Sequence, residues 1–340
     1  MPLNTVHFKS GTIVIAFVLY SLLVCARVAD RVDPFEQVKR MGRGVNIIGY
    51  DPIWRNFAEA RFKKEHFKLI REGGFKTVRI NLHAFDYMDS ANGYRLSNSF
   101  LSALDWAVKQ AVRNRLVVVL DLHNFMDFGK DPAKYKPMFL SFWKQIAPRY
   151  KKAPASVLFE LLNEPNGNLT PELWNAYLKE ALAVVRQTNP TRTVIIGPAF
   201  WNTIDHLNEL ELPENDRNIV VTVHYYEPMP FTHQAAPWSP KTVHLSGVTW
   251  GTNAEKKKVE EDFNRAQAWS RAHKRPLFLG EFGAYDKGGM DSRVRYTSHV
   301  ARTAESLGWA WAYWQFDSDF IVYDIDHSRW IEPIYKALVP

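Results

Sequence analysis

Short runs of consecutive apolar residues alternate along the chain with segments whose apolar residues recur every three to four positions. The apolar runs are rich in Val, Ile and Leu, which is typical of strands that are buried on both faces of a sheet. The segments between them have the helical period. The strands predicted in this way are 45–49, 77–82, 117–123, 157–164, 193–197, 219–226, 276–282 and 308–316. The predicted helices lie near 60–72, 98–114, 138–150, 171–187, 203–210, 255–273, 292–306 and 331–338.

This alternation predicts an α/β fold, because strands that alternate with helices form parallel sheets with crossover helices. Eight is the number of strands that closes a (β/α)8 TIM barrel. Helix starts agree with the count: Ser97 precedes one helix, and Thr170 and Pro171 supply a cap and a first-turn proline for another. The sequence has no internal repeat and no linker-like stretch. We therefore expect residues 27–340 to form a single barrel domain.

The first 26 residues have a different character. Lys9 is followed by an apolar run of about 15 residues, which is typical of a signal peptide and short for a membrane-spanning helix. Val24 and Ala26 are small enough for cleavage before Arg27. We expect a secreted or periplasmic protein, or a membrane-anchored one if the segment stays uncleaved. Cys25 is the only cysteine, so an internal disulfide is impossible.

Charge and composition narrow the function classes. The chain has 340 residues and a net charge of +7, but acidic residues are interleaved with the basic ones along the helices. This pattern indicates solvated helix faces and argues against a nucleic-acid partner. The 12 tryptophans suit both a large core and the stacking of sugar rings.

Polar and aromatic residues gather at the C-terminal ends of the predicted strands. In a TIM barrel all of these ends open into one shared cleft, so the residues are expected to converge there. They are Arg79 and Asn81 on the second strand, His123 and Asn124 on the third, Asn163 and Glu164 on the fourth, His224 and Tyr226 on the sixth, Glu281 on the seventh and Trp314 on the eighth.

Glu164 and Glu281 are the candidates for chemistry. Glycosidic bond hydrolysis needs one carboxylic acid to protonate the leaving oxygen, and one carboxylate to attack or stabilise the sugar carbon. Strands four and seven lie across the barrel mouth from each other. If the carboxyl groups are about 5–5.5 Å apart, the mechanism is double displacement with retention. The alternative is that both glutamates are salt-bridge partners on the rim.

Several motifs at these positions resemble those of glycoside hydrolase family 5, which includes many bacterial cellulases. The resemblance extends from about residue 43 to residue 330. The motifs are R-G-V-N-I-I-G-Y, T-V-R-I-N-L, L-H-N, L-L-N-E-P, V-H-Y-Y, G-E-F-G and the final W-Q-F. The pair N-E-P and G-E-F-G is the most specific part of the resemblance, since it contains both glutamates.

The resemblance implies that Glu164 is the acid/base and Glu281 the nucleophile. Arg79 would keep Glu281 ionised and its pKa low, and Tyr226 would donate a hydrogen bond to the same carboxylate. The environment of Glu164 should raise its pKa, with His224 beside it.

Further roles follow from the same resemblance. Asn163 would bind the sugar 2-hydroxyl and His123 other sugar hydroxyls, and Trp314 would form the floor under that sugar. All eight family positions carry the expected residue type.

The substrate is predicted with less precision than the chemistry. The long segment 227–253 after the sixth strand resembles that of family cellulases and should form part of the cleft wall. It favours internal cleavage of β-1,4-glucan. Trp54, Trp201 and Trp238 either stack on further sugars or pack in the core. Mannan, xyloglucan and β-1,3- or mixed-linkage glucan remain open, since subsite shape separates them.

Other function classes were weighed against a hydrolase. A metal-dependent barrel hydrolase would need a His-x-His pair on the first strand, which ends at Ile48, Gly49 and Tyr50 instead. We therefore expect no metal and no cofactor. A non-catalytic polysaccharide-binding protein and a transglycosylase that uses the same site are the remaining alternatives. We expect a monomer with no membrane contact beyond the N-terminal segment.

Overall fold

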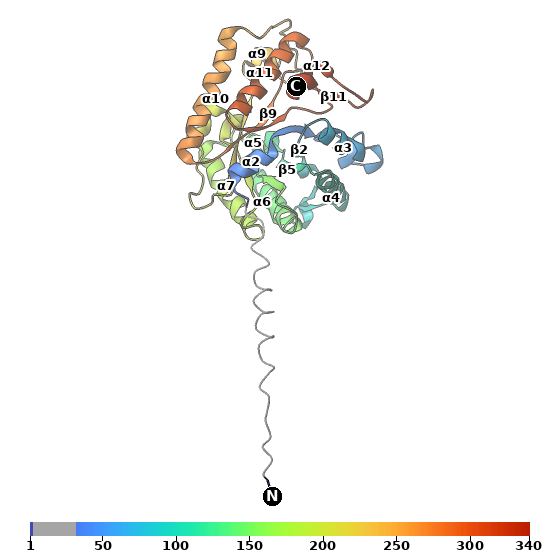
Figure 1. The fold of residues 1–340 in the computed structure, drawn as a ribbon, viewed down its shortest axis with the longest axis vertical. Helices are drawn as coiled ribbons and strands as arrows, with labels where there is room; N and C mark the ends of the chain where they lie inside the picture. Colours follow the sequence, from blue (N-terminus) through green and yellow to red (C-terminus); the bar gives the residue numbers. More distant parts are fainter. Residues whose placement is uncertain (3–31) are drawn as a thin grey trace. The chain divides into compact units, whose positions relative to one another are not determined.

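Eight parallel strands close into a barrel in the computed structural model, which describes residues 1–2 and 32–340 (Figure 1). Each strand pairs with its neighbours in sequence order, and the last pairs with the first. The predicted TIM barrel is therefore confirmed. The strands are β1 (Arg43–Ile47), β2 (Thr77–Leu82), β5 (Val117–Leu122), β6 (Val157–Glu160), β7 (Val194–Ile196), β8 (Ile219–Tyr225), β9 (Leu277–Phe282) and β10 (Ala310–Tyr313).

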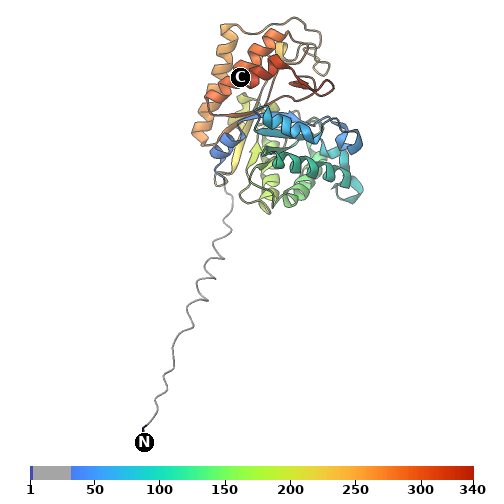
Figure 2. The same cartoon turned by 45° about the vertical axis from the view of Figure 1, so that its right-hand side comes forward.

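Helices surround the barrel in the order that the sequence predicts (Figures 1 and 2). Their starts are fixed by side-chain caps, such as the Ser97 Oγ that accepts from the Phe100 N–H at 3.2 Å. Asp131 caps the longer helix that precedes β6 in the same way. The main helices are α3 (Lys64–Glu72), α4 (Asn98–Arg113), α6 (Pro132–Arg149), α7 (Pro171–Arg186), α10 (Asn253–His273), α11 (Met290–Ser306) and α12 (Glu332–Leu338).

Several short elements were not predicted, because they are too brief to show a period. Two are hairpins, β3 (Met88–Asp89) with β4 (Arg95–Leu96) and β11 (Tyr323–Asp324) with β12 (Arg329–Trp330). The others are α2 (Pro34–Met41), α5 (Phe125–Lys130), α8 (Ala199–Asn202), α9 (Met229–Thr232), η1 (Pro52–Trp54), η2 (Phe57–Glu59), η3 (Ala84–Tyr87) and η4 (Ser90–Asn92). The helix predicted near 203–210 is the 3-10 helix η5 (Ile204–Glu209).

The predicted fourth strand is longer than the observed one. β6 ends at Glu160, and the four residues after it leave the regular ladder, although the Asn163 N–H still donates to the Leu122 carbonyl at 2.8 Å. Glu164 adopts a positive φ of 39°. The chain therefore turns at the strand end, and this turn sets the direction of the Glu164 side chain.

The barrel interior is apolar toward the N-terminal ends of the strands and polar toward their C-terminal ends. Val119, Leu158, Ile195, Val220 and Phe278 form a buried cluster inside the barrel. Helix α2 adds Val38 and Met41 to this cluster, so it closes the end of the barrel opposite the strand tips. Asn46, Arg79, Asn81, Asp121 and Glu160 are also fully buried, nearer the strand tips.

The N-terminal predictions fall outside the residues that the structure describes. The chain divides into two units, Met1–Arg31 and Val32–Pro340. The structure describes only residues 1–2 of the first unit, and it describes the whole of the second. Signal peptide, anchor and cleavage site thus stay predictions. Among the described residues, each helix is too short or too polar to span a membrane.

The plug formed by α2 is expected to contribute to stability without taking part in chemistry. Met41 is fully buried, so Met41→Ala should lower the free energy of unfolding by about 2–5 kcal/mol. Phe35→Ala on the exposed face of the same helix should change it by less than about 0.5 kcal/mol. Denaturant unfolding of both variants measures the difference. Equal losses would contradict the role of α2 as a plug.

Candidate active site

Glu164 and Glu281 lie together at the mouth of the barrel. Glu164 follows the end of β6 and Glu281 lies near the end of β9, so two separate strands support them. One side-chain ligand atom each of Glu164, His224 and Glu281 lies within 4.8 Å of the other two. Both carboxyl groups are almost entirely buried. Oxygens this close agree with double displacement, in which the carboxyl groups are about 5–5.5 Å apart, better than with single displacement, in which they are about 6.5–9.5 Å apart.

Arg79 lies beneath the pair and contacts three carboxylates. Its Nη1 donates to Glu281 Oε1 at 2.7 Å. Its Nε and Nη2 donate to the two oxygens of Glu160 at 2.7 and 2.8 Å, which is the bidentate geometry of a strong guanidinium–carboxylate pair. Asp121 Oδ2 lies 3.1 Å from Nη2. The side chain is completely buried, so these carboxylates and not solvent balance its charge.

The pKa of Glu281 differs from the sequence-based expectation. Burial raises it to about 7, while Arg79 and the hydroxyl of Tyr226, which donates to Glu281 Oε2 at 2.9 Å, act to lower it. The prediction that Arg79 keeps this pKa low is therefore wrong for the resting site. Arg79 acts in the predicted direction, but it is shared with Glu160 and Asp121 and does not cancel the cost of burial.

Glu164 has no direct bond to Arg79 among the described residues, although the charge of Arg79 also acts to lower its pKa. Burial raises its pKa well above the ordinary value, and the negative charge of Glu281 raises it further. The two carboxyl groups thus have unequal surroundings, which predicts that Glu281 ionises before Glu164. This is the division of roles that an acid and a nucleophile need.

His224 connects the two glutamates. Its Nδ1 lies 2.7 Å from Glu164 Oε1 and 3.6 Å from Glu281 Oε2. Burial and the charge of Arg79 lower the pKa of His224 well below its usual value, which favours the neutral ring. His224 is brought beside the predicted acid, as the sequence analysis expected.

Asn163, His123 and Trp314 line the same mouth. Asn163 Oδ1 accepts from Arg79, whereas its buried Nδ2 has no partner among the described residues, which leaves a donor free for a ligand. The rings of His123 and Trp314 stack with centroids 5.4 Å apart. His123 Nδ1 is 2.6 Å from Asp121 Oδ2, so this hydrogen bond to a buried carboxyl group fixes the orientation of the ring.

The three tryptophans suggested for sugar stacking divide into two groups. Trp201 and Trp238 are 42% and 49% exposed. Trp54 is only 3% exposed, and it packs on Phe100 while its indole N–H donates to the Ile48 carbonyl. Trp54 is therefore a core residue with no ring face free for a sugar, and the stacking alternative is wrong for it.

Several residues of the site were missed from the sequence. Glu160 and Asp121 were treated as ordinary strand positions, although a charged residue inside an apolar strand was a usable signal. Tyr50 and His83 follow the ends of β1 and β2, and their rings lie 5.2 Å apart beside Trp314 and His123. Asn202 had no recognisable signal, because an irregular turn brings it to the site.

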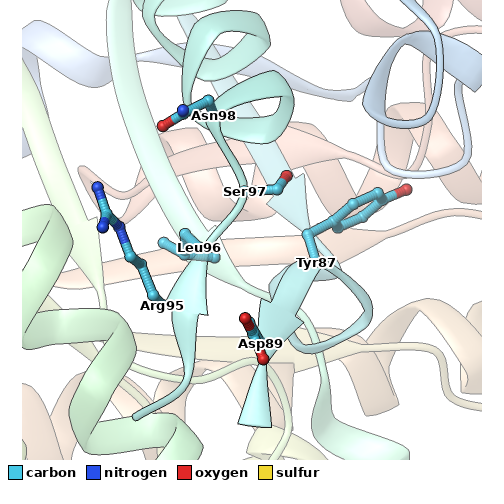
Figure 3. A pocket seen from close by; sticks show the side chains of 6 residues that line it. All are labelled: Tyr87, Asp89, Arg95, Leu96, Ser97 and Asn98. Atoms are coloured by element: carbon cyan, nitrogen blue, oxygen red, sulfur yellow. The ribbon is translucent and has the colours of Figure 1, made fainter. Parts of the chain in front are cut away.

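One hollow in the surface lies apart from the residues predicted for the site. A pocket of about 270 Å³ lies beside the β3–β4 hairpin, with Tyr87 and Asp89 on one side and Arg95 and Leu96 on the other (Figure 3). It contains none of the predicted site residues. This pocket therefore does not mark the candidate site, which is distinguished by its buried charged groups.

The grouping of Glu164, His224 and Glu281 also has the donor types of a metal site. Their donor atoms are already engaged with one another, and the Arg79 guanidinium lies 2.7 Å from Glu281. A cation at this point would compete with Arg79 and be repelled by it. The geometry favours acid–base and nucleophilic chemistry.

Comparison with known proteins agrees with this geometry. The model of the cellulase family, glycosyl hydrolase family 5, matches residues 38–319. The chain belongs to glycosyl hydrolase family 5.

Two relatives and two groups of solved structures are closely similar. Endoglucanase H of Acetivibrio thermocellus is 30% identical over 90% of this chain, and Endoglucanase 3 of Fibrobacter succinogenes is 25% identical over 88%. This chain spans only 34% and 53% of their lengths. Cel5A of Thermotoga maritima, solved with mannotriose and with cellobiose, is 40% identical with a TM-score of 0.86 over 90% of this chain and 100% of its own. The cellulose synthase subunit Z of Clostridioides difficile is 38% identical with a TM-score of 0.83 over 88% of this chain and 100% of its own.

The buried carboxylates should make stability depend on pH. Burial raises the pKa of Glu160 to about 7 and that of Asp121 to about 6. The folded protein then holds protons that the unfolded chain has released, so the free energy of unfolding falls as the pH rises from about 4.5 to 7. Glu160→Gln removes one of these groups and should reduce that fall by about 1–3 kcal/mol.

Denaturant unfolding at about pH 5 and pH 8 measures the effect. The control is Glu180→Gln on the surface of α7, where the carboxylate bonds Lys136 and has no contact with the barrel interior. The same pH dependence in Glu160→Gln and in wild type would contradict the account of Arg79 and its carboxylates.

Proposed function

We propose that this protein is a retaining, endo-acting glycoside hydrolase that cleaves β-1,4-glucan. The observation that supports this most directly is the pair of buried glutamates, with oxygens within 4.8 Å, of which Glu281 alone is bonded to Arg79. Family membership supports the same chemistry.

In the first step Glu281 is the nucleophile. An oxygen of its carboxylate bonds to the anomeric carbon while the bond from that carbon to the leaving oxygen breaks. Glu164 gives its proton to this oxygen, so the leaving sugar departs as a neutral alcohol. Arg79 and Tyr226 hold the attacking carboxylate in place through the bonds at 2.7 and 2.9 Å.

In the second step Glu164 is the base. It takes a proton from a water molecule, whose oxygen attacks the anomeric carbon and releases Glu281. The product keeps the configuration of the substrate. An acceptor sugar in place of water gives transglycosylation, which stays as an alternative outcome of the same intermediate.

The substrate is bound by the residues around the pair. Asn163 offers its free Nδ2–H to the 2-hydroxyl, which is a contact that strengthens in the transition state. His123 contacts sugar hydroxyls and Trp314 supports the ring beneath the cleaved bond. Trp201 and Trp238 present exposed indoles for sugars further along the cleft.

Internal cleavage of β-1,4-glucan is favoured by the endoglucanase relatives and by the solved complex of Cel5A with cellobiose. β-Mannan is the second candidate, because the same 40% identical protein was also solved with mannotriose. A site that admits both epimers at the 2-position would explain both ligands. We propose glucan as the principal substrate.

The remaining proposals concern the whole chain. Residues 1–26 act as a signal peptide or an N-terminal anchor, and residues 27–340 form the catalytic domain. The apolar run after Lys9 supports export to the periplasm or medium. The enzyme acts as a monomer without a cofactor.

Reducing-sugar release tests the proposed substrate. Wild type and Glu281→Gln are each assayed on carboxymethylcellulose, lichenan, glucomannan, xyloglucan and laminarin. We expect the strongest activity on carboxymethylcellulose or lichenan, and its loss in the variant. Activity on mannan or xyloglucan alone would show that the proposed substrate is wrong, while the proposed mechanism would still hold. Undiminished activity in Glu281→Gln would contradict the mechanism itself.

The acid role of Glu164 makes a separate prediction. Glu164→Ala should slow hydrolysis of the polysaccharide by about 10²–10⁴-fold, because the leaving oxygen then departs without a proton. An aryl glycoside with a good leaving group should lose much less of its bond-cleavage rate, measured in the first turnover. Equal losses on the two substrates would show that Glu164 is not the acid.

A further inference from the structure

The turn after β7 is strained at three consecutive residues. Phe200, Trp201 and Asn202 have φ values of 55°, 66° and 55°, and none of them is glycine. A left-handed conformation costs an ordinary residue about 1–2 kcal/mol, and such strain is found where a site requires a particular geometry. The turn directs Trp201 outward, where it is 42% exposed, and Asn202 inward, where it is fully buried. The strain thus brings one amide to the interior.

The amide of Asn202 lies between the main chain of Glu164 and the ring of His224. When the amide is oriented by its hydrogen-bond partners, its nitrogen donates to the Pro198 carbonyl at 3.0 Å and its oxygen accepts from the Glu164 N–H at 3.3 Å. In this orientation both ends of the amide have suitable partners. The amide atom 3.4 Å from His224 Nε2 is then the oxygen.

Neighbouring residues leave space for this arrangement. A Cβ on Gly197 would come within 2.1 Å of the Asn202 amide, and a Cβ on Gly280 within 2.9 Å of His224 Nε2. Both positions therefore require glycine for the amide and the imidazole to meet. Asn202 also supports the backbone of Glu164 at its positive φ of 39° through the contact to its N–H.

The contact determines where the proton of the neutral imidazole lies. An amide oxygen only accepts, so the contact to Nε2 is attractive only if Nε2 carries the hydrogen. Nδ1 is then bare and also only accepts. Because Nδ1 is 2.7 Å from Glu164 Oε1, the hydrogen in that bond belongs to the Glu164 carboxyl group.

We propose that Asn202 is a positioning residue that fixes His224 as its Nε2–H tautomer and thereby keeps the acid proton on Glu164. The proposal rests on the proposed function, in which Glu164 is the acid. It also explains the second step. After Glu164 has lost its proton, its carboxylate faces the lone pair of Nδ1, and this repulsion favours the uptake of a proton from water.

Other charged groups face the same pair and act with Asn202. Burial raises the pKa of Glu164 and lowers that of His224, which leaves the proton on the carboxyl group as the tautomer requires. The charged or titratable side chains around Glu164 and His224 include Tyr50, Arg79, Asp121, His123, Glu160, Tyr226 and Glu281.

The tautomer is directly measurable in the resting enzyme. Long-range ¹H–¹⁵N correlation spectra of the full chain distinguish a protonated from a bare imidazole nitrogen, and His224→Gln identifies the signals that belong to this ring. We expect a protonated Nε2 and a bare Nδ1 at neutral pH. A protonated Nδ1 of His224 in wild type would overturn the proposal.

Substitutions test the link to catalysis. In Asn202→Leu the ring is free to place its hydrogen on Nδ1 and donate to Glu164, which stabilises the ionised acid. The alkaline limb of the pH profile of kcat/KM on the polysaccharide should then move to lower pH. At neutral pH kcat/KM should fall by about 10-fold, and its fall on a reactive aryl glycoside should be smaller. Asn202→Asp keeps an oxygen toward Nε2, so its alkaline limb should stay or move to higher pH.

Asn175→Leu is the matched control. Asn175 is a buried asparagine of α7 whose amide bonds only to the main chain of Glu209 and Glu211, so its loss costs stability without touching the site. We expect it to keep the wild-type pH limb. A limb in Asn202→Leu that matches this control would overturn the proposal. Inactivity of wild type on every glycan would instead overturn the proposed function, while the spectra of the resting enzyme still decide the tautomer.

Discussion

The active site depends on the positive charge of Arg79 inside a closed barrel. The guanidinium is completely buried and bonds to Glu160, Asp121 and Glu281 at once. A buried cation is stable only where carboxylates surround it, and buried carboxylates are stable only beside a cation. The barrel wall supplies both from separate strands. Glu281, the proposed nucleophile, is therefore the outermost member of an ion cluster whose other members are fixed by the fold.

The two glutamates differ because only one of them touches this cluster. Glu281 accepts from Arg79 and Tyr226, whereas Glu164 contacts a neutral imidazole. Two side chains of the same type, with oxygens within 4.8 Å of each other, thus have different hydrogen-bond partners, and this difference suits them to different roles. The turn with Phe200 and Asn202 adds to this asymmetry from the other side, since it orients the imidazole through a neutral amide. In the proposed mechanism, charge acts on Glu281 and hydrogen-bond direction acts on Glu164.

The barrel and the grouping of Glu164 with Glu281 could be predicted from the sequence, and the network beneath them only in part. β2 has its predicted bounds, because an apolar run in a parallel barrel is a strong signal. Glu160 was not recognised, since nothing in a one-dimensional pattern indicates that its partner is Arg79 on another strand. Trp54 and Trp201 are both tryptophans that follow a strand, so the sequence does not separate them. Only tertiary packing makes Trp54 a core residue and Trp201 an exposed one. Asn202 depends on a strained turn that no propensity predicts.

The most direct test of this account is to measure which glutamate ionises first. ¹³C NMR of protein labelled at the glutamate carboxyl carbons follows each group with pH, and Glu164→Gln and Glu281→Gln assign the two signals. The account predicts that in wild type Glu281 loses its proton at lower pH than Glu164. Ionisation of Glu164 before Glu281 would contradict the central claim, because Arg79 would then not determine which carboxylate is the nucleophile.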